Sequence, residues 1–223
     1  MRFDQFFTPA DVCAVAYSSW ESTSDGIRIG DFACGNGALL ELAPFPNKTV
    51  YGMDIDSEVI ESLKTQHDKW SLHSGDFLYP DDSAAQFLDP IRGSLDLVVL
   101  NPPFSCRGGS RVEIAHNQSV LNCSTAMAFL VRSLDFVSPG GSAMAIMPRS
   151  VLKSEKDALA LGLVRENWII DIREEFPRTT FYGCHPHSCC LSLRRQTTKA
   201  AHCSRPIHRA ISQRGKQVRL IRG

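Results

Sequence analysis

Apolar residues along this chain follow two alternating patterns, short continuous runs typical of buried strands and longer stretches with helical spacing. The strand-like runs predict seven strands, at 27–33, 49–54, 71–75, 95–100, 142–147, 168–173 and 188–193. The helix-like stretches predict helices beginning near residues 8 and 38, and over 57–69, 125–137 and 151–167. Strands that alternate with helices are typical of an α/β fold with one largely parallel sheet and helices on both faces.

The first predicted helix has a recognisable start. Thr8 is expected to be its N-cap, with Pro9 at the first helical position, since a hydroxyl caps free N–H groups and proline fits the first turn. The helical spacing of Val12, Val15 and Ala16 then predicts an inner face made of these three side chains.

Composition narrows the class of protein. The chain has 223 residues, of which 43% are hydrophobic and 22% charged, as in a soluble globular protein with one large domain. Its apolar runs are shorter than the ~18–20 residues that a membrane span needs. The first residues lack the basic start and apolar stretch of a secretory signal. We therefore expect a cytoplasmic protein.

Eight cysteines are scattered along the chain without Cys-x-x-Cys pairs, so reduced thiols are expected. The densest cluster of potential metal ligands comprises Cys184, His185, His187, Cys189 and Cys190. Its spacing matches no zinc signature. We expect no metal.

Charge is distributed unevenly although the net charge is zero. From Leu191 onward the chain has nine basic residues and no acidic ones, against 15 basic and 24 acidic residues before that point. The basic residues are Arg194, Arg195, Lys199, Arg205, Arg209, Arg214, Lys216, Arg219 and Arg222. Such a tail either contacts a polyanion or is simply solvated, and charge alone leaves both interpretations open.

A glycine-rich turn, Asp31 to Gly37 with the sequence DFACGNG, follows the first predicted strand. Glycines let the backbone approach a ligand, and the next helix offers free N–H groups there. Asp54 ends the second predicted strand, 17 residues after Gly37. An acid near that offset meets a ribose in dinucleotide-binding folds, so this pair of features favours a nucleoside cofactor.

The sequence Asn101-Pro102-Pro103-Phe104 directly follows the apolar run at 95–100. The prolines stiffen the chain and leave carbonyl groups free to face a ligand. Asn101 adds a side-chain acceptor at the carboxyl edge of the sheet, where open α/β sheets bind ligands. Phe104 adds a flat surface on which a base can stack. The pattern indicates a site that holds an amino group by two acceptors.

Together these motifs resemble the N6-adenine DNA methyltransferases of the γ motif order. Phe6 to Pro9 matches that family's opening aromatic-Thr-Pro segment, and Gly75-Asp76-Phe77 matches its adenine-contacting motif. The resemblance implies a class I S-adenosylmethionine-dependent methyltransferase fold, with seven strands and the last one antiparallel. It implies cofactor binding by Phe7, Thr8, Pro9, Asp31, Ala33, Cys34, Gly35, Gly37, Asp54, Ile55, Asp76, Phe77 and Asn101.

The same resemblance implies methyl transfer to N6 of an adenine in DNA, as in restriction–modification systems, with Asn101, Pro102, Pro103 and Phe104 as catalytic residues. The target base would be flipped out of the duplex and stacked between Phe104 and Phe181. Phe176 is the second candidate for that last position. A loop over 105–119, rich in Gly and Ser, is expected to close on the nucleic acid.

The likeness covers about residues 3–194, so we predict a catalytic domain at 1–194 and a basic extension at 195–223. A target-recognition region of the kind that follows in this family is not evident, and a separate recognition subunit could supply it. Three other interpretations stay open: methylation of adenine in RNA, methylation of a protein glutamine, and a cofactor-binding subunit inactive alone.

Overall fold

The computed structural model describes residues 8–18, 26–104, 111–116, 119–178, 180–181 and 187–196. The α-helices are α1 (Ala10–Tyr17), α2 (Ala38–Glu41), α3 (Ser57–Gln66), α4 (Asp82–Leu88), α5 (Thr125–Ser133) and α6 (Ala158–Asn167). The strands are β1 (Ile27–Asp31), β2 (Lys48–Asp54), β3 (Ser71–Ser74), β4 (Leu95–Leu100), β5 (Arg111–His116), β6 (Ser119–Ser124), β7 (Val137–Pro148), β8 (Trp168–Phe176) and β9 (Ser188–Arg195).

Seven strands form one sheet in the order β3-β2-β1-β4-β7-β9-β8. Neighbouring strands are parallel except for β9, which runs antiparallel to both β7 and β8. The predicted class I fold, with its antiparallel last strand, is therefore confirmed. Strand order reverses between β1 and β4, and ligands of open α/β sheets bind at the carboxyl ends of the strands beside such a switch point.

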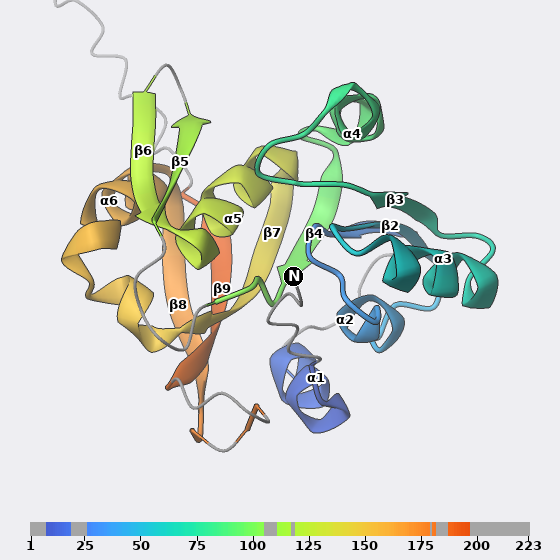
Figure 1. The fold of residues 1–223 in the computed structure, drawn as a ribbon. Coiled ribbons are helices and arrows are strands. Elements are labelled where there is room, and N and C mark those ends of the chain that lie inside the picture. Colours follow the sequence, from blue (N-terminus) through green and yellow to red (C-terminus); the bar gives the residue numbers. More distant parts are fainter. Residues whose placement is uncertain are drawn as a thin grey trace, which may run out of the picture.

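Helices cover both faces of this sheet (Figure 1). Buried side chains of α1, α2 and α3 form one hydrophobic cluster with residues of β1, β2, β4 and β7. Those of α4, α5 and α6 form a second cluster on the other face. Because β4 and β7 are covered on both faces, Leu97–Leu100 of β4 and Ala143–Met147 of β7 are continuous apolar runs. Packing on both faces thus holds the central strands in place, and with them the loops at the carboxyl ends of these strands.

The start of the first helix differs from the prediction. Pro9 is the N-cap of α1 and no side chain caps it, because the Thr8 hydroxyl is engaged by a distant side chain described below. Val15 is 39% exposed, whereas Cys13 and Tyr17 are buried beside Val12 and Ala16. The inner face is thus rotated from the predicted one, since Tyr17 donates its hydroxyl to the Leu39 carbonyl at 2.6 Å.

Three other helices are shorter than predicted, among them the helix expected over 125–137, which ends at Ser133 before a 3-10 turn at Leu134–Phe136. The helix expected over 151–167 begins only at Ala158, because 3-10 turns occupy Arg149–Leu152 and Glu155–Asp157. The helix expected over 57–69 ends at Gln66, and α4 was not predicted. No helix within the described ranges is long and apolar enough to cross a membrane.

A two-stranded hairpin, β5 and β6, stands apart from the main sheet and was not predicted either. Its strands occupy Arg111–His116 and Ser119–Ser124, so the loop expected over 105–119 is in part regular structure. Ile114, Leu121 and Cys123 are only 1–2% exposed. These inward-facing side chains bury the hairpin against α5 and explain why it is ordered.

Candidate functional site

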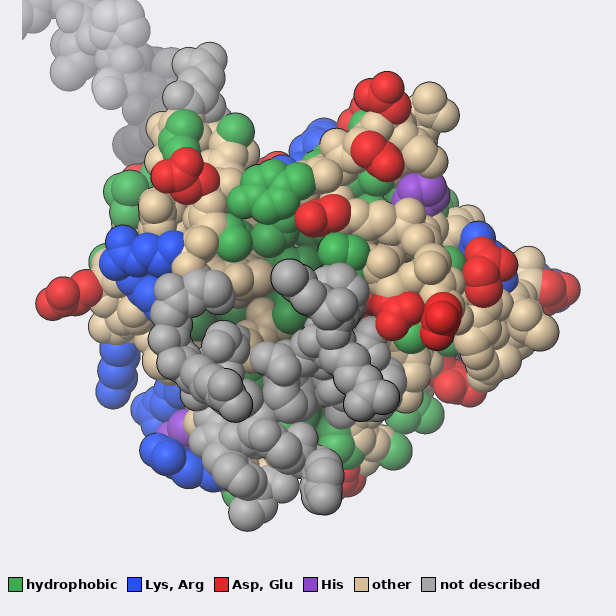
Figure 2. Space-filling view, viewed as in Figure 1, with side chains coloured by type: hydrophobic (Ala, Val, Ile, Leu, Met, Phe, Trp, Pro, Cys, Tyr) green, Lys and Arg blue, Asp and Glu red, His purple; other side chains and the backbone are tan. Residues whose placement is uncertain are grey.

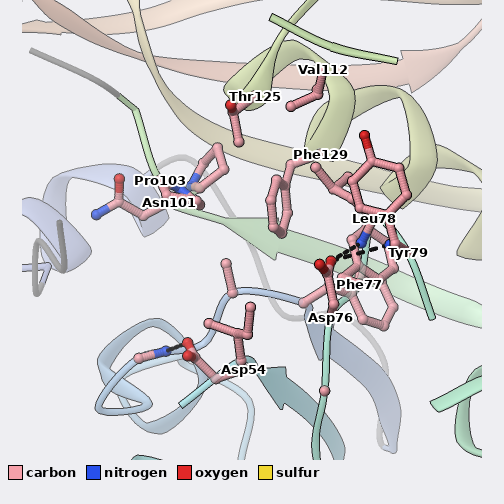
Figure 3. A pocket seen from close by; sticks show the side chains of 16 residues that line it. Asp54, Asp76, Phe77, Leu78, Tyr79, Asn101, Pro103, Val112, Thr125 and Phe129 are labelled. Atoms are coloured by element: carbon pink, nitrogen blue, oxygen red, sulfur yellow. Dashed lines mark hydrogen bonds between the residues drawn. The ribbon is translucent and has the colours of Figure 1, made fainter. Parts of the chain in front are cut away.

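A cavity of about 280 Å³ opens at the carboxyl edge of the sheet (Figure 3). Its walls come from the glycine turn after β1, the end of β2, the loop after β3, the segment after β4, the hairpin and α5. They comprise Phe32, Ala33, Gly35, Asp54, Ile55, Gly75, Asp76, Phe77, Leu78, Tyr79, Asn101, Pro102, Pro103, Val112, Thr125 and Phe129. The structure therefore brings the glycine turn, both acidic motifs and the Asn-Pro-Pro segment to one space.

The glycine turn depends on backbone conformations that other residues rarely adopt. Gly35 has φ +50° and Gly37 has φ +79°. A Cβ on Gly37 would also lie only 3.0 Å from Leu63 Cδ2. The Gly35 N–H donates to Asp54 Oδ2 at 2.8 Å. This bond ties the turn to the end of the neighbouring strand β2.

Asp54 is placed to bind a hydroxylated ligand. Its Oδ1 accepts from the Asp56 N–H at 3.0 Å while Oδ2 accepts from Gly35. Each carboxylate oxygen can accept more than one hydrogen bond, so both retain capacity toward the cavity that Asp54 lines. Fixed by two backbone donors, this carboxylate suits the ribose hydroxyls of a nucleoside. The neighbouring Ile55 is 46% exposed and also lines the cavity.

Asp76 lies on the opposite side of the cavity, in the loop after β3. Its Oδ1 accepts from the N–H groups of Leu78 and Tyr79, at 2.8 and 3.1 Å. Both of these hydrogen bonds go to Oδ1, so within the described residues Asp76 Oδ2 is available to accept a hydrogen bond from a ligand. The geometry suits an exocyclic amino donor such as that of adenine.

Phe77 differs in part from its predicted role. It lines the cavity, but it is 2% exposed and its ring stacks on Phe32 at 4.5 Å and 3°. Phe129 of α5 is more exposed and projects into the cavity (Figure 3). The sequence did not single out Phe129, because nothing in the residues around it distinguishes a helical core phenylalanine from a ligand-facing one.

Asn101 lies directly after β4 at the edge of this cavity. Its Nδ2 donates to the Thr8 hydroxyl at 3.0 Å, across 93 positions of sequence. The bond orients the amide so that the donor nitrogen is engaged by Thr8, and Thr8 is thereby joined to the Asn-Pro-Pro segment. Pro102 is buried and Pro103 exposed, and both line the cavity. Pro9, the N-cap of α1, is half-buried.

The two rings expected to sandwich a base are brought together but do not form a sandwich. Phe104 and Phe181 meet edge to face, with centroids 6.2 Å apart and an angle of 83°. Both are buried, at 5% and 2% exposure, so a base between them requires one ring to turn. Phe176, the second candidate, is buried in the core beside α1.

A smaller cavity of about 20 Å³ lies between the glycine turn and Asn101. Thr8, Cys34 and Asp31 contribute to its wall. Asp31 is 2% exposed, and burial, with a smaller contribution from the negative charge of Asp54, raises its pKa from 3.8 to about 7. A hydrogen bond from the Ala33 N–H, 3.0 Å long, only partly offsets this. Such a carboxyl is suited to a cationic ligand, which would restore its charge.

Several predicted residues lie outside the described part of the chain, namely Phe7, Cys184 and His185. Of the remaining cluster, Cys189 and Cys190 are fully buried in β9, where burial raises their thiol pKa values to about 11 and 12. The residues that the structure describes contain no group of three potential metal ligands. Buried thiols of this kind behave as small hydrophobic side chains.

Comparison with known proteins shows the family to which the chain belongs. The family model described as the methyltransferase small domain matches residues 20–151. The chain is 26% identical over 170 residues, 70% of its length, to the rRNA N(6)-adenosine-methyltransferase metl-5 of Caenorhabditis elegans, of which it covers 71%.

Solved structures are similar in fold. One is described as a class I S-adenosylmethionine-dependent methyltransferase from Listeria monocytogenes, with a TM-score of 0.66 and 17% identity; the match covers 86% of this chain and 62% of that one. Another is a dimethyladenosine transferase from Plasmodium falciparum, with a TM-score of 0.56, 15% identity and coverage of 86% and 64%. A third is the 23S rRNA methyltransferase ErmE, with a TM-score of 0.55, 14% identity and coverage of 88% and 70%.

Proposed function

Because this chain belongs to the methyltransferase small domain family and is an S-adenosylmethionine-dependent methyltransferase, we propose that it methylates N6 of adenine in RNA. The observation that carries the proposal is Asn101-Pro102-Pro103-Phe104 at the carboxyl end of β4, beside a cavity with two carboxylates suited to a nucleoside. We propose RNA in preference to the DNA substrate expected from the sequence, because the relative named above is an rRNA N(6)-adenosine-methyltransferase.

The chemistry requires little from acids or bases. The N6 lone pair of adenine is delocalised into the ring, so the amino group is a poor nucleophile. Asn101 Oδ1 and the Pro102 carbonyl would accept its two hydrogens, favour a pyramidal nitrogen and stabilise the charge that develops on it. Bound S-adenosylmethionine supplies an activated methyl group on a sulfonium. Positioning by Asp54, Asp76 and the glycine turn supplies much of the remaining rate enhancement.

Charge supports a polyanionic substrate on the side of the molecule formed by residues 111–196. Residues 26–104, which contain the proposed cofactor contacts, have five basic and twelve acidic side chains. Residues 111–196 have ten basic and eight acidic ones. In Figure 2 the Lys and Arg side chains gather on the left, over α6 and β8, whereas Asp and Glu predominate on the right, over α3. Phosphates would therefore approach over α6 and β8 rather than over α3.

A second candidate substrate is adenine in DNA. The observation that favours it is the bond between Thr8 and Asn101, because Thr8 belongs to the opening Phe-Thr-Pro segment shared with the γ-type DNA enzymes. A protein glutamine amide poses the same chemical problem as adenine N6 and remains an outcome of the test rather than a proposal.

Product analysis decides between these substrates. The purified chain is incubated with labelled S-adenosylmethionine and, separately, with unmethylated rRNA, genomic DNA and total protein, and each product is digested. We expect label in N6-methyladenosine from RNA. Label in N6-methyldeoxyadenosine alone would establish the DNA substrate instead, and label in methylglutamine would overturn adenine methylation.

Asp54→Ala is expected to weaken S-adenosylmethionine binding by roughly 10–100-fold, since it removes the proposed ribose acceptor and the partner of the Gly35 N–H. Isothermal titration calorimetry measures the Kd. Asp68→Ala is the matched control, because Asp68 is an exposed carboxylate that does not line the cavity. Equal affinities in the two variants would contradict the proposed role of Asp54.

Removing residues 197–223 is expected to weaken RNA binding and to reduce its dependence on salt. That segment has seven basic and no acidic residues, and each phosphate that the shortened chain no longer neutralises lowers the salt slope by about one unit. RNA affinity is measured between about 50 and 200 mM salt for both chain lengths. Unchanged slopes would indicate that the tail is merely solvated. If RNA is bound but not methylated, a separate recognition subunit becomes the next component to add.

A further inference from the structure

The β5–β6 hairpin forms part of the cavity wall. It follows the Asn101–Phe104 segment in sequence, and its Val112 side chain lines the cavity together with Thr125 and Phe129 of α5. The inward-facing Ile114 and Leu121 are almost fully buried in the core. The hairpin is therefore a stable part of the cavity wall, next to α5.

Tyr79, in the loop after β3 that contains Asp76, contacts the hairpin directly. The Tyr79 side chain is 55% exposed, and its hydroxyl donates to the Glu113 carbonyl at 2.9 Å. The Tyr79 backbone N–H donates to Asp76 Oδ1 at 3.1 Å. Tyr79 thus connects Asp76, the carboxylate proposed to bind adenine, with strand β5 of the hairpin. In Figure 3 its ring lies on the Val112 and Phe129 side, across the cavity from Asp54.

The base of the hairpin is held by a separate contact, at Ser124, which pairs with Arg111. The Ser124 N–H donates to Asp157 Oδ1 at 2.7 Å, and Asp157 is a 1% exposed carboxylate at the start of α6. Ser124 also caps α5 by accepting from the Met127 N–H. Loss of the Tyr79 hydroxyl would therefore release β5 at Glu113 and leave the base of the hairpin, where Arg111 pairs with Ser124, in place.

We infer that Tyr79 is a positioning residue: its hydroxyl holds the hairpin wall against the loop that binds the adenine end of the cofactor. The inference rests on the proposed location of the cofactor in this cavity. A cofactor there contacts both the Asp76 loop and the Val112 and Phe129 side chains, which line the same cavity. The dissociation rate of the cofactor and the mobility of the hairpin are consequently coupled: a hairpin held in place slows cofactor release, and a bound cofactor holds the hairpin in place.

Tyr79→Phe tests the inference because it deletes only the donor. S-adenosylmethionine dissociation is measured by stopped-flow displacement for the wild type, Tyr79→Phe and the control Tyr51→Phe. Tyr51 likewise loses a single hydrogen bond, from Arg28 at 3.0 Å, but lies outside the cavity wall. We expect dissociation about three- to tenfold faster for Tyr79→Phe, as one hydrogen bond implies, with an unchanged rate for the control.

Two further readouts separate positioning from simple stability. The melting temperature of Tyr79→Phe without cofactor should stay within about 2 °C of the wild type, since the bond is exposed. Cofactor should slow amide hydrogen exchange in residues 111–116 of the wild type but much less in Tyr79→Phe, while the Gly35 amide is protected in both. Equal dissociation rates and equal hairpin protection would overturn the role of Tyr79. If Asp54→Ala leaves cofactor affinity intact, the cofactor's proposed location fails instead.

Discussion

Replacing Asn101 by alanine is expected to reduce the rate of methyl transfer by at least roughly 10²–10³-fold, the usual cost of losing one group that stabilises developing charge. The Asn101 amide would accept a hydrogen of the target amino group and thereby hold the nitrogen toward the methyl donor. Its Nδ2 bond to Thr8 fixes the amide orientation in which Oδ1 can do so. The variant should therefore lose kcat while substrate affinity changes far less.

The measurement compares single-turnover methylation with S-adenosylmethionine affinity in the same preparation. Asn101→Ala should keep cofactor affinity within a few-fold of the wild type, because Asp54 and Asp76 are untouched. Asn167→Ala serves as the control, as Asn167 is an exposed asparagine at the end of α6, away from the cavity. If affinity fell in step with activity, Asn101 would be a cofactor ligand and its assigned role would be wrong.

Asp31→Asn is expected to stabilise the protein above pH 7 and, at the same pH, to weaken cofactor binding. The folded-state pKa of Asp31 is raised to about 7, mainly by burial. Between about pH 4 and pH 7 the unfolded chain has released a proton that the folded chain keeps, so stability falls as pH rises through this range. Asparagine does not have this cost, so the free energy of unfolding of Asp31→Asn should exceed that of the wild type by roughly 1–4 kcal/mol above pH 7 and should be nearly equal to it below pH 4.

Cofactor affinity should respond in the opposite direction. The ionised Asp31 carboxylate lies in the small cavity with Thr8 and Asn101, where it would attract the ammonium group of the methionine end. Wild-type affinity should therefore rise as pH increases through about 7, and that rise should be absent in Asp31→Asn, which should bind roughly 10–100-fold more weakly at pH 8. Chemical denaturation and calorimetry from about pH 4 to 8.5 measure both effects. A variant that gains stability without losing affinity would leave Asp31 with no role in binding.

The opposition between stability and binding has a physical origin. No cation among the described residues pairs with the buried Asp31 carboxyl, and a carboxyl group buried in this way costs folding free energy. The pKa of Asp31 is high for this reason, and the same desolvation strengthens the attraction to a bound cation. Strained or desolvated groups of this kind are common at binding sites, where a ligand supplies what the protein lacks.

The motif residues of the cavity could be found in the sequence because each lies at a strand end. Gly35 follows β1, Asp54 ends β2 and Asn101 follows β4. In a parallel sheet with the order β2-β1-β4 these ends lie side by side, so a linear pattern of short motifs already implies one site.

Residues that line the cavity from other elements gave no such signal. Val112 belongs to a hairpin whose alternation is obscured by neighbouring Gly and Ser residues, and Phe129 is one apolar residue among many in α5. Tyr79 lies in a loop, and its contact with Glu113 spans 34 positions. These contributions depend on how distant segments pack, which local periodicity does not encode.

The role of Thr8 is the clearest case in which tertiary contact outweighs local preference. A threonine before a proline is a good N-cap by local rules, yet its hydroxyl binds Asn101 and the helix is left without a side-chain cap. The Thr8 hydroxyl accepts a hydrogen bond from Asn101 Nδ2 instead of from a backbone N–H of the first turn of α1.

The sequence by itself determined the fold class, the seven strands of the main sheet, and the motif residues, because period-two and period-3.6 patterns and turn chemistry are local properties of the chain. Only the tertiary structure decided that Thr8 binds Asn101, that Phe104 and Phe181 meet edge to face, and that Tyr79 joins the two sides of the cavity. Those contacts depend on distances between segments far apart in sequence, which are fixed by packing against the shared core.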